Sequence, residues 1–104
     1  MDIRTAVKKA LMPPTDSEQF GKIAEELTRL FTAKNEDYGG NNESVAQQMY
    51  HRYGDQYFCT MVMQKALRIE ASKDKNFESV EDSYRDIACY AIMALIEHGR
   101  MARW

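Results

Sequence analysis

One stretch of the chain decides its fold: ESVEDSYRDIACYAIMALI, residues 78–96. It opens with acidic residues and closes with an apolar run that covers residues 87–96. A helix that spans a membrane needs roughly 20 apolar residues, so this run is too short to cross a bilayer and should be buried in protein. No part of the chain keeps the two-residue alternation of a strand. The stretch therefore predicts a long helix in an all-α protein.

The apolar run is hydrophobic on opposite sides of the predicted helix. One side carries Ile87, Ala91 and Leu95, and the other carries Cys89, Met93 and Ile96. A helix that is apolar all round is normally buried all round. Since a chain of 104 residues offers few other helices to cover it, we expect a homo-oligomer, either a dimer or a dimer of dimers.

Working outward, apolar spacing and chain breaks predict four to five helices in a small bundle. They cover about residues 2–12, 16–35, 44–51, 55–72 and 78–99. Pro13 and Pro14 end the first helix, and Thr15 with Glu18 forms a capping box at the start of the second. We expect one all-α domain over residues 1–104, with an N-terminal helix and Pro-Pro break at 1–14, a core bundle at 15–99 and a tail at 100–104. In the helix over 55–72, the inward residues should be Phe58, Met61, Val62, Ala66 and Ile69.

Charge and cysteine content narrow the class of protein. The formal charge is −2, so no bulk binding of nucleic acid is expected. Cys59 and Cys89 form no CxxC pair, and both are expected to be core residues of a reduced protein. The N-terminus lacks a signal-peptide pattern. We therefore expect a cytoplasmic protein without a membrane segment.

Three carboxylates form a row on the predicted last helix: Glu78, Asp82 and Asp86, at four-residue spacing. Glu81 has Arg85 four residues on, whereas the row has no such partner on its own stripe. A divalent cation such as Mg²⁺ would relieve the repulsion, because Mg²⁺ prefers carboxylate oxygens. The alternative is a solvated acidic face near the start of a helix, where the helix dipole favours negative charge.

Two further features are candidates for binding an anion. Lys65 lies beside the apolar stripe of its helix and Arg68 shares its side, so both could meet the carboxylate row or a phosphate group. The alternative is that both side chains extend into solvent. The motif KNEDYG, residues 34–39, offers Asp37 to a metal and Tyr38 to a base, although a polar helix end before a turn explains it equally well. His51 and His98 have no metal-spaced partner, so packing or surface roles are expected.

Taken in order, KNEDYG at 34–39, KALRI at 65–69 and ESVEDSYRDIACYA at 78–91 resemble the phage-associated nucleotide modification domain. That domain is similar to the MazG-like all-α NTP pyrophosphatases. The resemblance implies an oligomeric helical bundle that binds nucleotides in the host cytoplasm. It also implies Mg²⁺ held by helix carboxylates, which would position water for hydrolysis.

Carried over to this chain, the resemblance implies a role for each matching residue. Glu78, Asp82 and Asp86 would be metal ligands and catalytic residues. Lys65 and Arg68 would face the phosphates, with Lys34, Asp37 and Tyr38 on the nucleotide as well. The chain departs from the enzymes at their first E-x-x-E pair, because Glu25 and Glu26 are followed three residues on by Thr28 and Arg29.

Three functions therefore stay open. The first is a Mg²⁺-dependent nucleotide pyrophosphohydrolase. The second is a non-catalytic sponge that sequesters a host immune signalling nucleotide, such as a cyclic one, as an anti-defence protein. The third is a structural helical oligomer.

Overall fold

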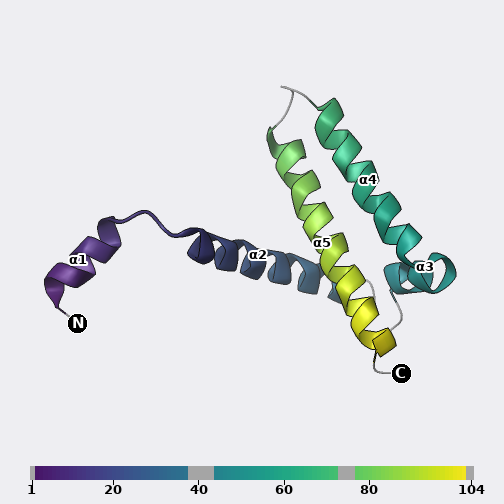
Figure 1. Cartoon of the computed structure of the whole chain (residues 1–104), viewed down its shortest axis with the longest axis horizontal. Coiled ribbons are helices and arrows are strands. Elements are labelled where there is room, and N and C mark those ends of the chain that lie inside the picture. The colour runs from purple at the N-terminus through teal and green to yellow at the C-terminus, as the bar shows by residue number, and fades with distance from the viewer. Residues whose placement is uncertain (1, 38–43, 73–76, 103–104) are drawn as a thin grey trace. The chain divides into compact units, whose positions relative to one another are not determined.

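The computed structural model of the chain consists of helices, with no strand among the residues whose placement it describes, 2–37, 44–72 and 77–102. Side chains are described for these residues except 9–10, 35–37, 77–79 and 101–102. The helices are α1 (Ile3–Leu11), α2 (Asp16–Asp37), α3 (Val45–Tyr53), α4 (Asp55–Ala71) and α5 (Phe77–Ala102) (Figure 1). The predicted all-α fold is confirmed, and each predicted helix has an observed counterpart.

The chain divides into two compact units, Met1–Leu30 and Phe31–Trp104. In the first unit, Pro13 and Pro14 separate α1 from α2. The backbone N–H of Glu18 donates to the Thr15 hydroxyl at 3.1 Å, so the predicted cap of α2 forms. This bond satisfies one of the N–H groups that every helix leaves without an intrahelical partner at its start.

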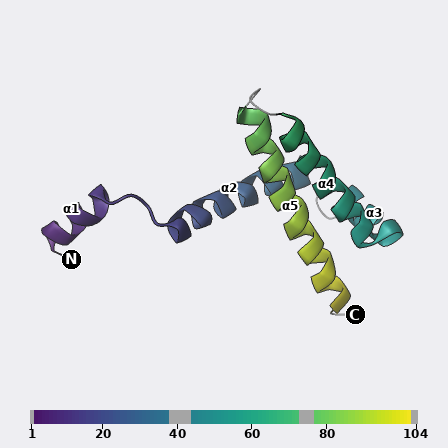
Figure 2. The same cartoon turned by 45° about the horizontal axis from the view of Figure 1, so that its top comes forward.

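The second unit is built on an antiparallel pair of long helices. Figures 1 and 2 both show α4 and α5 side by side, and α3 contacts both of them. Among the described helices, none is both long enough and apolar enough to cross a membrane. The apolar run of α5 belongs to a helix that packs against α4.

Gly54 makes the bend between α3 and α4. Its φ of +62° and ψ of −149° lie in a region that is essentially restricted to glycine. The Gly54 N–H donates to the Tyr50 carbonyl at 2.7 Å, which closes the end of α3. At the other end of α3, the N–H of Gln47 donates to the Ser44 hydroxyl at 3.1 Å. One residue thus ends α3, which is capped at both ends, and bends the chain into α4.

Aromatic side chains form the core where the three helices meet. Phe58 of α4 is 4% exposed and packs against Tyr50 of α3 and Tyr57, with ring centroids 5.7 and 5.1 Å away. Tyr57 in turn meets Tyr90 of α5 edge to face at 6.5 Å. The inward position predicted for Phe58 is confirmed. The inward position predicted for Ala66 is wrong, because Ala66 lies about 80° round α4 from the buried Phe58 and is exposed.

Candidate functional site

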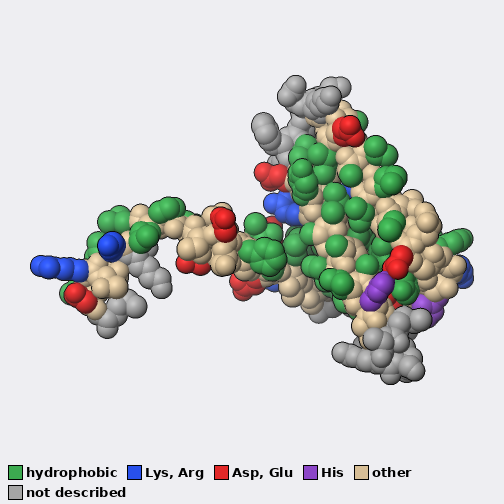
Figure 3. All heavy atoms as spheres, viewed as in Figure 1, with side chains coloured by type: hydrophobic (Ala, Val, Ile, Leu, Met, Phe, Trp, Pro, Cys, Tyr) green, Lys and Arg blue, Asp and Glu red, His purple; other side chains and the backbone are tan. Residues whose placement is uncertain are grey.

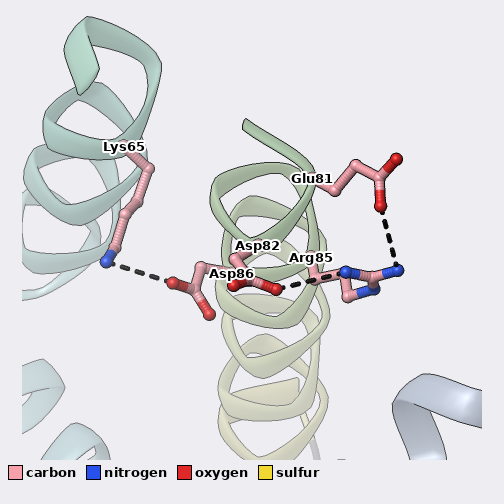
Figure 4. A network of polar contacts seen from close by, with 5 residues as sticks. All are labelled: Lys65, Glu81, Asp82, Arg85 and Asp86. Carbon is pink, nitrogen blue, oxygen red and sulfur yellow. Dashed lines mark hydrogen bonds and ion pairs between the residues drawn. The ribbon is translucent and has the colours of Figure 1, made fainter. Parts of the chain in front are cut away.

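An ion pair joins the middle of α4 to α5. The ammonium of Lys65 lies 3.1 Å from Oδ2 of Asp86, and Figure 4 shows the two side chains pointing toward one another. Lys65 is four residues from both Met61 and Ile69, which places it on the packed side of α4. Its side chain is 16% exposed, against 38% for Asp86. The structure thus brings together one predicted cation and one predicted carboxylate.

Asp82 pairs with Arg85, the residue that four-residue spacing predicts as the partner of Glu81. Oδ1 of Asp82 accepts a hydrogen bond from the Arg85 guanidinium at 3.2 Å, while Oε2 of Glu81 lies 3.7 Å from the same group. The sequence predicts no partner for the row on its own stripe, but Arg85, three residues from Asp82 and beside that stripe, pairs with Asp82. The physical reason is that residues three and four apart are both neighbours on a helix, so Arg85 reaches both carboxylates at once.

The two described carboxylates of the row are neighbours on one face of α5. Figure 4 shows Asp82 and Asp86 one turn apart, with Arg85 to one side and Lys65 to the other. No group of three or more potential metal ligands occurs within the described part of the chain. The side chain of Glu78 lies outside that part, so its place in the row stays a prediction.

Two more predicted cations, Arg68 and Lys34, are among the described residues. Arg68 follows Lys65 by three residues, so both lie on neighbouring sides of α4, and Arg68 is exposed. Lys34, near the C-terminal end of α2, lies close enough to Cys89 for its charge to lower the pKa of the thiol. The predicted Asp37 side chain and the whole of Tyr38 lie outside the described residues.

Two residues that follow Asp86 on α5, Cys89 and Tyr90, have raised pKa values. Burial raises the pKa of the Cys89 thiol, the charge of Asp86 raises it further and Lys34 opposes the rise. Burial also raises the pKa of the Tyr90 phenol, with smaller contributions from Tyr57, Asp86 and Cys89. Asp86 is therefore close enough to both groups for its charge to act on them.

The structure also contains a contact that sequence reasoning missed. Nε2 of His98 on α5 lies 2.7 Å from Oδ1 of Asp55, the first residue of α4. The two residues are 43 positions apart, and no local spacing signals their approach. By contrast, the three-residue spacing of Asp82 and Arg85 could have revealed their contact. His51, the other histidine, is exposed.

The cysteines differ from each other in burial. Both are free thiols, with Cys89 half-buried and Cys59 exposed. The core position predicted for Cys59 is wrong, because its side of α4 faces away from the packed aromatic side chains.

Fold and site together define a small all-α protein with a mixed lysine and carboxylate cluster between two antiparallel helices. The sequence profile of the family called nucleotide modification associated domain 1 matches residues 34–98, which is more than half of the chain. The chain belongs to this family. The match includes Lys34, Lys65, Arg68 and the acidic part of α5. No curated protein and no solved structure matches the chain significantly.

Proposed function

We propose that the α4–α5 pair binds a nucleoside triphosphate or a related phosphate ester. In this proposal Lys65 and Arg68 contact phosphate oxygens, while Asp82 and Asp86 hold Mg²⁺. The observation that carries it is the contact between Lys65 and Asp86, in which a cation of a kind that can bind phosphate lies beside a carboxylate of a kind that can bind Mg²⁺. Membership in a family associated with nucleotide modification supports the choice of a nucleotide.

The cations have complementary properties for this task. The Lys65 side chain is only 16% exposed, so a phosphate oxygen that meets it would be less screened by water than one that meets a fully solvated lysine. The exposed Arg68 guanidinium can present two parallel N–H groups to a phosphate. Lys34 adds a third positive charge close to Cys89. Together they could neutralise part of a polyphosphate chain.

The carboxylates fit the chemistry of Mg²⁺. This ion commonly binds one or two protein carboxylates and fills its remaining positions with water and substrate phosphates. The contact to Lys65 involves only Oδ2 of Asp86, and the contact to Arg85 only Oδ1 of Asp82. Each carboxylate thus has a second oxygen that could face a metal ion. Glu78, one turn further toward the start of α5, is the third proposed ligand.

Binding would redistribute these contacts. An arriving phosphate oxygen would take the place of Asp86 at the Lys65 ammonium, which frees the Asp86 carboxylate to hold the metal. Bound Mg²⁺ would lower the pKa of a coordinated water and neutralise a pyrophosphate leaving group. Arg68 would keep the phosphate chain oriented. On the expected base or sugar side, the proposed contacts are Asp37 and Tyr38.

The contact between Arg85 and Asp82 favours a second candidate function. A carboxylate already paired with an arginine on its own helix has less need of a metal ion. The site could then bind a phosphorylated signalling nucleotide without hydrolysing it, as a sponge does. The two candidates share the ligand class and differ in turnover.

A thermal-shift panel separates these functions. The purified protein is heated with each of several nucleoside triphosphates and cyclic nucleotides, with and without Mg²⁺, and bound ligand at 100 times its dissociation constant adds about 2.7 kcal/mol of stability. The same mixtures are then assayed for monophosphate and pyrophosphate. Turnover that Asp82→Asn abolishes and Glu70→Gln retains supports the hydrolase. A shift without turnover supports the sponge, and no shift with any nucleotide contradicts both.

A further inference from the structure

Arg85 lies beside the carboxylates of the candidate site, on the other side from Lys65 (Figure 4). One terminal nitrogen of its guanidinium lies 3.2 Å from Oδ1 of Asp82, and the other lies 3.7 Å from Oε2 of Glu81. Figure 3 shows basic and acidic side chains next to each other at the edge of α5. Any cation that binds to Asp82 therefore meets the positive charge of Arg85.

The Arg85 guanidinium opposes a metal ion at Asp82. Two positive charges that share one carboxylate repel each other, even in water. In the free protein Arg85 partly neutralises Asp82, which lowers the attraction of this carboxylate for Mg²⁺. The side chain of Asp82 is 72% exposed, so solvent screens its contact with Arg85 and makes the contact weak enough to exchange.

A phosphate group would offer Arg85 a new partner in the same place. A phosphate that shares a metal ion with Asp82 is a neighbour of that carboxylate, which the Arg85 guanidinium already contacts. The Arg85 side chain is 36% exposed, so protein does not enclose it on all sides. A rotation of this side chain would exchange a carboxylate oxygen for a phosphate oxygen.

The chemistry of arginine suits this exchange. The planar guanidinium of Arg85 directs its two terminal nitrogens to two different carboxylates. The same two nitrogens can donate two parallel hydrogen bonds to a single phosphate. A lysine at this position would bring the charge without the paired donors, so a conservative substitution separates the two properties.

A purely local role for Arg85 is the alternative. An arginine often pairs with carboxylates three or four residues away on its own helix, and such exposed pairs add little to stability. In that case, removing Arg85 would leave metal and nucleotide binding unchanged or weaken both. An exchange of partners predicts opposite effects on the two ligands.

We propose that Arg85 exchanges Asp82 for a phosphate group when a metal ion and a nucleotide bind together. It thereby weakens the binding of metal alone and strengthens the binding of metal with nucleotide. This inference rests on the proposed function, because it takes Asp82 as a metal ligand. It adds a phosphate contact to those proposed for Lys65 and Arg68, and it couples the two ligands through one side chain.

Two titrations of Arg85→Gln test the proposal. The first adds Mn²⁺ without nucleotide and measures the free ion by electron paramagnetic resonance, since Mn²⁺ shares the preference of Mg²⁺ for carboxylate oxygens. We expect the variant to bind Mn²⁺ about fivefold more tightly than the parent, because a positive charge about 4 Å away is removed. The second is calorimetry with each ribonucleoside triphosphate and Mg²⁺. Here we expect binding to be weaker by about tenfold or more, because charge-assisted hydrogen bonds are lost.

Two further variants separate contact from charge. Arg85→Lys keeps the charge but loses the paired donors, so it should bind Mn²⁺ like the parent and nucleotide more weakly. Arg52→Gln removes an exposed arginine of α3, which carries none of the proposed site residues, and should match the parent in both titrations. Circular dichroism checks that each variant is as helical as the parent. If Arg85→Gln unfolds, the loss of nucleotide binding in Arg85→Lys decides the question.

Three results would overturn the inference. Mn²⁺ binding that Arg85→Gln leaves unchanged or weakens would show that Arg85 does not compete for Asp82. Nucleotide binding that survives both changes at Arg85 would show that it contacts no phosphate, and would leave the proposed function standing. A parent protein that binds no nucleotide would contradict the proposed function itself and, with it, this inference.

Discussion

Lys65 of α4 lies 3.1 Å from Asp86 of α5, in the middle of an antiparallel helix pair. Asp86 has two roles, one in the free protein and one proposed for the nucleotide complex. It pairs with Lys65, whose side chain is largely buried, in the free protein, and it is a proposed metal ligand in the nucleotide complex. To act as a metal ligand, Asp86 must leave Lys65, so the ion pair has to be weak enough for a phosphate oxygen to replace Asp86 there.

The first prediction concerns the strength of the ion pair between Lys65 and Asp86. Because Asp86 is more than a third exposed, solvent screens the attraction, and we expect a coupling free energy of about 0.5–1 kcal/mol. A double-mutant cycle with Lys65→Met and Asp86→Asn, followed by urea unfolding at one chain concentration, measures it. Adding salt should reduce the coupling. A coupling above about 3 kcal/mol would mean a locked structural pair and would argue against exchange with phosphate.

Gly54 gives a prediction about the bend between α3 and α4. Gly54→Ala forces a side chain into a backbone region that only glycine adopts readily, and it should cost about 1–3 kcal/mol of unfolding free energy. No atom stands within 4 Å of the added methyl group, so the cost is purely conformational. The matched control is Gly99→Ala inside α5, which also meets no atom and should stabilise the chain by about 0.5–1 kcal/mol. Equal effects of the two changes would contradict this assignment.

The aromatic core yields a third prediction. Phe58→Ala removes the one hydrophobic residue classed as buried among the described residues of the second unit, and we expect it to lower the unfolding free energy by about 3–5 kcal/mol. Tyr53→Ala, at an exposed aromatic of α3, should cost far less. Circular dichroism during urea titration compares the two variants. A Phe58 variant as stable as the Tyr53 variant would show that the helix pair is held together elsewhere.

The raised pKa values of Cys89 and Tyr90 predict how stability changes with pH. Their ordinary values are 9.0 and 10.0, and both are raised in the folded chain. Between its ordinary and its raised pKa, each group keeps its proton when folded and loses it when unfolded. The unfolded state then binds fewer protons, so stability falls as pH rises through this range. Below pH 9 the contribution of both groups is fully present.

Melting curves from pH 7 to pH 10.5 check this expectation. The variant with Cys89→Ser and Tyr90→Phe has neither titrating group, so its melting temperature should fall less steeply above pH 9 than that of the parent. Other tyrosines and the lysines titrate in both proteins, and the difference between the two curves isolates the pair. Parallel curves would show that Cys89 and Tyr90 titrate alike in both states.

Much of the fold could be predicted from the sequence, because a helix forms through interactions between residues that are close together in the chain. Apolar spacing, the two prolines, the Thr15 cap and the break at Gly54 all act within a few residues. The position of Lys65 beside the packed stripe follows from the same spacing. The contact between Asp55 and His98 could not be predicted, because it depends on the register of α4 against α5. The exposure of Cys59 was also missed, because an apolar pattern is the same whether its own chain or another copy covers it.

The candidate site was predictable in part for the same reason. The four-residue spacing of the row places Asp82 and Asp86 on one face of α5, and the structure has them there. Which of Glu81 and Asp82 meets Arg85 depends on side-chain rotamers, and in the structure both do. The roles of Glu78, Asp37 and Tyr38 stay predictions.

Isothermal titration of the protein with each of the four ribonucleoside triphosphates in the presence of Mg²⁺ tests the central claim most directly. We expect at least one to bind, and we expect Lys65→Gln to weaken that binding about tenfold or more, since a charge-assisted hydrogen bond contributes about 1.5–3 kcal/mol. Lys22→Gln, which removes an exposed lysine of α2 outside the site, should bind like the parent. Binding that survives Lys65→Gln unchanged, or the absence of binding for all four nucleotides, would contradict a nucleotide site between α4 and α5.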